Sequence, residues 1–91
     1  MIAKYRKKPV VIEAVQYTGD NAEEIFEWMN TVNTCAAYID PDEDNSLMII
    51  TLEGEMQCRP EWYVLRGVRD EFYPCDPEIF IETYEKADEQ T

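Results

Sequence analysis

The sequence contains no histidine, and its three glycines stand alone at Gly19, Gly54 and Gly67. Without histidine the chain cannot build a Ser-His-Asp or Cys-His catalytic arrangement, a histidine-ligated metal site or a histidine pH switch. Isolated glycines provide no glycine-rich loop for binding phosphate groups. These absences favour a protein that is not an enzyme and that uses no cofactor.

Cysteine is also scarce, and its pattern matches neither a disulfide framework nor a zinc site. Cys35, Cys58 and Cys75 are odd in number and include no Cys-x-x-Cys pair, whereas both kinds of site use paired cysteines. We therefore expect reduced thiols. Cys75 lies at a predicted helix start, where the helix dipole lowers a thiol pKa, but Asp76 and Glu78 oppose that effect, so we do not expect a reactive thiol.

Long hydrophobic runs are missing as well. No segment approaches the ~20 apolar residues of a membrane-spanning helix. After the basic start of the chain only Val10–Ile12 is apolar, which is too short for the hydrophobic region of a secretory signal. We expect an intracellular protein that makes no membrane contact. A chain of 91 residues predicts one domain, with a frayed polar tail at 86–91.

Positive charge is confined mainly to the first residues of the chain. The formal net charge is −12, with 20 acidic and 8 basic residues, and half of the cations lie within residues 4–8. Residues 9–91 hold four cations against all 20 acids, a balance of −16. A protein that binds a nucleic-acid duplex needs a basic face, so we expect no direct nucleic-acid binding. The basic start is typical of a flank that discourages pairing at a strand edge.

Hydrophobic patterning predicts an α+β fold. Strands are expected at 10–17, 35–39, 46–52, 55–59, 61–66 and 71–73, and helices at 22–31 and 77–85. In the first helix Asn21 and Glu24 form a capping-box pattern; in the second, Asp76 caps and Pro77 takes the first position. We predict a small antiparallel sheet of about five strands, with the first strand central, one main helix packed on the sheet and a short C-terminal helix.

The acidic residues are the first candidate binding surface. A protein with a basic face would be attracted to acids on the first helix, in the loop at 40–45 and in the hairpin near Gly54, namely Glu23, Glu24, Glu27, Asp40, Asp42, Glu43, Asp44, Glu53 and Glu55. The other interpretation is that these acids only solvate the surface. The loop resembles the start of an EF-hand, but Asn45 and Thr51 replace the required Gly and Glu, so we predict no metal site.

Aromatic and arginine residues near the end of the chain are the alternative candidate. Stacking rings and guanidinium groups can hold a nucleotide, and the residues suited to that role are Trp62, Arg66, Arg69 and Tyr73. The competing interpretation is structural, because a small sheet needs large side chains to fill its core.

Two segments of the chain resemble a group of small uncharacterised proteins encoded by tailed bacteriophages and prophages. These are the opening run KYRKKPVVIEAVQ at 4–16, and the closing run YVLRGVRDEFYPCDPEIF at 63–80 with TYE at 83–85. Together they cover about a third of the chain. The chain departs from the group at Glu61, within Pro60-Glu61-Trp62-Tyr63 where relatives often have Pro-Gly-Asp-Tyr, and at Asp70, where a glycine is common. The resemblance implies a phage origin and residence in the cytoplasm of an infected host, and it carries no established activity.

Together these observations lead to a hypothesis of function. We expect a non-catalytic phage accessory protein that binds and inhibits a host component with a basic surface, such as a nuclease or another antiphage-defence factor. The alternatives are a binding protein for a small nucleotide signal and a phage structural or assembly protein. A homo-oligomer remains open.

Overall fold

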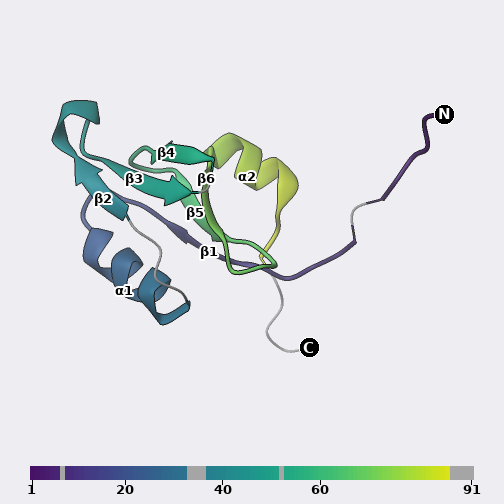
Figure 1. Cartoon of the computed structure of the whole chain (residues 1–91), viewed down its shortest axis with the longest axis horizontal. Coiled ribbons are helices and arrows are strands. Elements are labelled where there is room, and N and C mark those ends of the chain that lie inside the picture. Colours follow the sequence, from purple (N-terminus) through teal and green to yellow (C-terminus); the bar gives the residue numbers. More distant parts are fainter. Residues whose placement is uncertain (7, 33–36, 52, 87–91) are drawn as a thin grey trace.

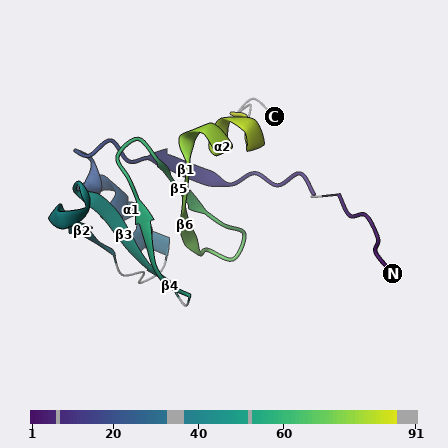
Figure 2. The ribbon, with the colours of Figure 1, turned by 90° about the horizontal axis from the view of Figure 1, so that it is seen from above.

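The computed structural model describes residues 1–6, 8–32, 37–51 and 53–86. The described residues form two α-helices, a short 3-10 helix and antiparallel strands. Figures 1 and 2 show the first residues of the chain extending away from the body. The elements are β1 (Glu13–Gln16), α1 (Ala22–Val32), β2 (Ala37–Asp40), η1 (Pro41–Glu43), β3 (Ser46–Thr51), β4 (Gly54–Cys58), β5 (Tyr63–Arg66), β6 (Phe72–Cys75) and α2 (Pro77–Thr83).

The predicted α+β class and both helices are confirmed, but the prediction of one sheet of about five strands is wrong. The described strands form two antiparallel three-stranded sheets, ordered β1-β5-β6 and β2-β3-β4. The chain leaves the second sheet at Pro60, which lacks an N–H for strand pairing. Glu61 then turns the backbone at a φ of 79°, and its N–H donates to the carbonyl of Tyr17 at 2.6 Å. This turn directs β5 to pair with β1.

β1 is shorter than predicted and lies at a sheet edge. It covers 13–16 and not 10–17, and within the described chain β5 is the central strand of its sheet. Glu13 pairs with Arg66, the last residue of β5. Residues 10–12 therefore have no residue of β5 opposite them, and their β-branched side chains alone do not make them a strand.

The main core lies between the two sheets and α1. Ile25 and Met29 of α1 pack with Leu47 and Ile49 of β3, and all four side chains are at most 1% exposed. Val64 completes the cluster from the first sheet. The predicted packing of this helix on the sheet is confirmed by its two buried residues, Ile25 and Met29, which are four positions apart and so share one face of α1.

α2 covers the opposite face of the first sheet. The Phe80 ring stacks on Tyr63 of β5, with ring centroids 3.9 Å apart and planes 10° from parallel. As predicted, the Asp76 carboxylate caps the helix by accepting a 2.8 Å hydrogen bond from the Glu78 N–H, with Pro77 in the first turn. The first sheet is thus covered on both faces, by α1 and by α2.

Asn21 precedes α1 as predicted, but its side chain is used differently. Its Oδ1 accepts from the Thr18 N–H at 2.9 Å, and its Nδ2 donates to the Gln16 carbonyl at 2.8 Å. The side chain therefore fixes the turn between β1 and α1 in place of closing a capping box with Glu24. Asparagine side chains often form such hydrogen bonds to nearby backbone groups in turns.

Three further observations complete the comparison with the sequence. Residues 35–36 of the predicted strand 35–39, and residues 87–91 of the predicted frayed tail, lie outside the described residues. The predicted hairpin forms, but the expected turn at Glu53-Gly54 is displaced by one residue, because Gly54 is the first residue of β4 and pairs with Thr51, the last residue of β3. Among the described residues, no helix combines the length and apolar composition needed to cross a membrane.

Candidate binding surfaces

Six of the nine acidic candidates lie at one end of the molecule, which we call the acidic end. α1 runs beside β3 in the same direction in both views, so the first turn of α1 and the loop before β3 are at the same end (Figures 1 and 2). The acidic end consists of Glu23, Glu24, Asp40, Asp42, Glu43 and Asp44. All are exposed except Asp40, which is half-buried.

The acidic loop has a defined conformation. The Asp40 carboxylate caps η1 by accepting a 3.0 Å hydrogen bond from the Asp42 N–H. Asp44 and Asn45 follow with φ of 56° and 58°, a left-handed conformation that these two residue types tolerate better than most. The Tyr17 hydroxyl, which belongs to a side chain only 1% exposed, donates to the Asn45 carbonyl at 2.6 Å. The loop is therefore anchored to the core.

The remaining acidic candidates are not part of this cluster. Glu27 lies one turn further along α1, and Glu53 and Glu55 lie at the far end of β3. Six strand residues at about 3.3 Å each separate the two ends of β3 by roughly 17–20 Å. Glu55 accepts a hydrogen bond from the Tyr38 hydroxyl. Six acids thus lie at the acidic end, Glu53 and Glu55 lie at the far end of β3, and Glu27 belongs to neither group, so the nine do not form a continuous patch.

None of the nine acids has a cationic partner in the described part of the chain. The two ion pairs formed there both belong to Arg66. Nor do the described histidine, cysteine and acidic side chains form any group of three or more that could hold a metal ion. Five carboxylates of the acidic end are therefore exposed to solvent, Asp40 caps η1, and none of the six has an ion-pair partner among the described residues.

Arg66 is held in a network of its own. Its guanidinium donates to Asp70 Oδ1 at 2.7 and 2.9 Å and to Glu13 Oε1 at 2.9 Å. Trp28 of α1 donates its indole N–H to the same Glu13 oxygen at 3.1 Å. The hydrogen bonds from Trp28 and Arg66 hold the pKa of Glu13 below its ordinary value of 4.5, and the bond from Trp28 is the largest cause. The hydrogen bonds that Arg66 makes to Asp70 and Glu13 raise the pKa of Arg66, and the bond to Asp70 is the largest cause.

The structure does not bring the four aromatic and arginine candidates to one place. Arg66 pairs with Phe72, whereas Tyr73 pairs with Leu65, so Arg66 and Tyr73 lie on opposite faces of the sheet. Trp62 packs against the main core, and Arg69 is exposed in the turn between β5 and β6. A single nucleotide cannot contact this set as the sequence hypothesis requires.

The described cysteines are free thiols. Burial raises the pKa of Cys58 to about 12. Burial and the neighbouring Asp76 carboxylate raise the pKa of Cys75 as well, in line with the expectation that the helix start does not activate this thiol. Cys35 lies outside the described residues.

Comparison with protein-family models, with curated proteins and with solved structures found no match.

Tyr73 lines a cavity together with Lys8 and Tyr84, two residues that the sequence reasoning missed. No local signal could have found them, because they come from opposite ends of the sequence and meet only in the folded chain.

Proposed function

We propose that this chain is a non-catalytic phage accessory protein that uses its acidic end to bind a host protein with a basic surface and to inhibit it. The observation that carries the proposal is that six carboxylates from two separate elements lie at the same end of the molecule, without an ion-pair partner among the described residues. Unpaired surface charge of one sign raises the rate and selectivity of encounter with a partner of opposite sign.

The anchoring of the acidic loop favours a binding role over simple solvation. The bonds from Asp42 to Asp40 and from Tyr17 to Asn45 hold the loop in one shape before any partner arrives. A surface that is already ordered loses less conformational entropy when it binds. An inhibitor that acts by occupying a basic site benefits from such preorganisation.

Two backbone angles support the phage assignment. Glu61 and Asp70, the residues at which the chain departs from the glycines of the phage group, have φ of 79° and 62°. Glycine adopts such positive angles most readily. The chain therefore keeps, with other residues, a turn conformation that glycine favours at these two positions.

The test is capture of host proteins on the immobilised full chain at low and moderate salt. The acidic-end variant carries Asp42→Asn, Glu43→Gln and Asp44→Asn. Its matched control removes the same charge from the α2 region with Glu78→Gln, Glu82→Gln and Glu85→Gln. Asp40 is left intact because it caps η1.

We expect one basic partner whose retention falls steeply with salt, since exposed charge pairs are screened over about 10 Å at 0.1 M salt. The acidic-end variant should lose that partner while the control keeps it, and the purified partner should lose its own activity when the chain is added. Retention that ignores salt, or equal loss in both variants, contradicts the proposal. A partner that binds and stays fully active contradicts the inhibitory part.

A further inference from the structure

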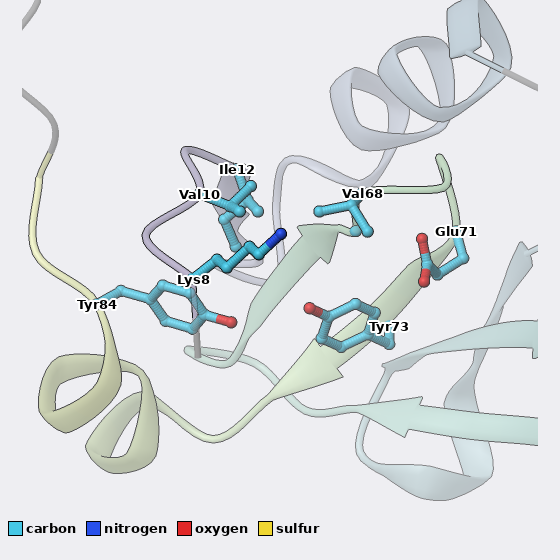
Figure 3. A pocket seen from close by; sticks show the side chains of 8 residues that line it. Lys8, Val10, Ile12, Val68, Glu71, Tyr73 and Tyr84 are labelled. Carbon is cyan, nitrogen blue, oxygen red and sulfur yellow. The ribbon is translucent and has the colours of Figure 1, made fainter. Parts of the chain in front are cut away.

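A cavity of about 270 Å³ lies away from the acidic end, where the segment before β1, the β5–β6 turn and the chain after α2 meet (Figure 3). Three aliphatic side chains form one part of its lining: Val10, Ile12 and Val68. Two tyrosines and a lysine form another. The segments involved come from both ends of the sequence, so the cavity is a product of the tertiary fold.

The polar groups of the cavity converge. Figure 3 shows the hydroxyls of Tyr73 and Tyr84 pointing toward one another, with the Lys8 amino group between them and the aliphatic side chains. Burial, together with a hydrogen bond to Tyr84, raises the pKa of Tyr73 to about 12. The Tyr73 hydroxyl therefore keeps its proton at neutral pH and shares it with Tyr84, so the two hydroxyls form a bonded pair.

We propose that this cavity binds a small organic carboxylate with an apolar body. Lys8 would pair with the carboxylate, and the bonded tyrosine pair would reorient to donate one hydroxyl proton toward it, because ammonium and phenol groups donate hydrogen bonds that strengthen toward an anion. Val10 and Val68, which are 51% and 70% exposed, and the half-buried Ile12 would contact the apolar body from one side.

The charges around the cavity restrict the ligand to a single negative charge. Glu71 also lines it and is held at the turn, where its Oε1 accepts from the Arg69 N–H at 2.9 Å. This carboxylate and the net charge of −12 both repel a ligand with several negative charges. One ammonium group is enough to pair with a monocarboxylate, whereas a nucleotide phosphate brings more charge than the site can neutralise.

The experiment is an NMR titration of the full ¹⁵N-labelled chain with hexanoate, followed through backbone amide signals. We expect saturable shifts confined to the neighbourhood of Val10, Ile12, Val68 and Tyr73. Hexanamide, inorganic phosphate and AMP serve as comparison ligands and should bind at least about tenfold more weakly. Hexanamide lacks the charge that strengthens a hydrogen bond, and phosphate and AMP bring more negative charge than Lys8 can pair with beside Glu71.

Two variants test the assigned groups. Lys8→Met should weaken hexanoate by about tenfold and leave hexanamide unchanged, while Lys4→Met, a matched loss of charge on the same segment outside the cavity, should change neither. Tyr73→Phe keeps the ring and should weaken hexanoate severalfold through the lost hydroxyl. The amide spectrum of each variant shows whether the fold is retained.

A peptide arm distinguishes the two sources of a carboxylate. N-acetyl-Ala-Ala-Leu with a free carboxylate presents the end of a protein chain, and its carboxamide is the control. Binding of the free acid over the amide supports the proposal, and affinity above that of hexanoate assigns the ligand to a chain terminus.

Several results would overturn the proposal: no saturable shift with hexanoate or the peptide acid, equal binding of hexanamide, tighter binding of AMP, or equal effects of Lys4→Met and Lys8→Met. The proposal does not depend on the acidic end, because the variants used there leave every cavity residue unchanged.

Discussion

Replacing Glu61 with glycine should make this protein more stable. Glu61 is exposed, has a φ of 79°, and uses its backbone N–H and carbonyl to bind Tyr17 and the side chain of Gln16. A residue with a Cβ loses about 1–2 kcal/mol in the left-handed region. Glycine removes that strain but adds about 0.4–1 kcal/mol of entropy to the unfolded chain.

The net expectation for Glu61→Gly is a gain of about 0.5–1 kcal/mol in the free energy of unfolding, since about 1.5 kcal/mol of strain outweighs roughly 0.7 kcal/mol of chain entropy. In a chain of this size that gain corresponds to a Tm higher by roughly 2–8 °C. Urea unfolding followed by circular dichroism measures the first quantity, and a thermal scan measures the second.

Three further substitutions separate strain from other causes. Glu61→Gln keeps the Cβ and removes the charge, so it should leave stability nearly unchanged. Glu61→Asn should fall between Gln and Gly, because asparagine tolerates positive φ. Glu27→Gly, in the interior of α1, should destabilise by about 1 kcal/mol. If Glu61→Gly lowered stability as Glu27→Gly does, or if Glu61→Gln were as stabilising as Glu61→Gly, the strain argument would be wrong.

The other predictions concern the β5–β6 turn, the Trp28 network and the core thiol. Gly67→Ala should lower the free energy of unfolding by about 1 kcal/mol, the value of one hydrogen bond. The added Cβ would lie 2.5 Å from the Glu71 Cδ and would displace the Glu71 carboxylate from its bond with the Arg69 N–H. A double-mutant unfolding cycle should show no such loss when Glu71 is first replaced by alanine. Trp28→Phe should raise the pKa of Glu13 toward 4.5, as followed by ¹³C NMR of the carboxyl group. Because the folded pKa is the lower one, the stability that Trp28 adds through Glu13 is present above pH 4.5 and disappears as the pH falls through the folded value; an unchanged pKa would exclude this bond as its cause. Cys58, with its pKa raised to about 12 by burial, should resist iodoacetamide at mildly alkaline pH in the folded chain and react in urea, as peptide mass spectrometry can show; rapid labelling without urea would contradict its burial.

The sequence predicted the elements that local interactions determine. The helix near 22–31 and the capped start of α2 at Asp76 form as predicted, and the hairpin near Gly54 forms with its turn one residue earlier than predicted. Each depends on residues within about a turn of one another, such as a capping carboxylate three residues or fewer from its amide. Such contacts are visible in the order of residues.

The division into two sheets and the place of β1 could not be predicted in the same way. The β-branched run Val10–Ile12 has strand propensity, but a strand also needs a partner, and β5 ends at Arg66, opposite Glu13. The left-handed conformation of Glu61 is likewise imposed by tertiary bonds to Tyr17, against the local preference of glutamate. Non-local pairing decided both outcomes.

For the candidate binding surfaces too, the sequence predicted local properties and could not predict those that depend on the fold. The sequence identified acids as surface charges, but only the fold shows that Glu23 and Asp42 share an end while Glu53 lies at the other. Arg66 resembled a ligand-binding residue in the sequence, whereas in the structure Glu13 and Asp70 occupy its guanidinium. Charge is a property of composition, but its arrangement and its neutralisation are properties of the fold.

The pairing of β1 with β5 also constrains how the chain can fold. Val15 finds its partner only at Val64, so the first strand cannot complete its hydrogen bonds until more than half of the polypeptide has left the ribosome. Contacts this distant along the chain slow the folding of small proteins. The β3–β4 hairpin, whose strands are joined by a tight turn, requires no such delay. We therefore expect the hairpin to form during synthesis and the first strand to dock last, as a late and rate-limiting event.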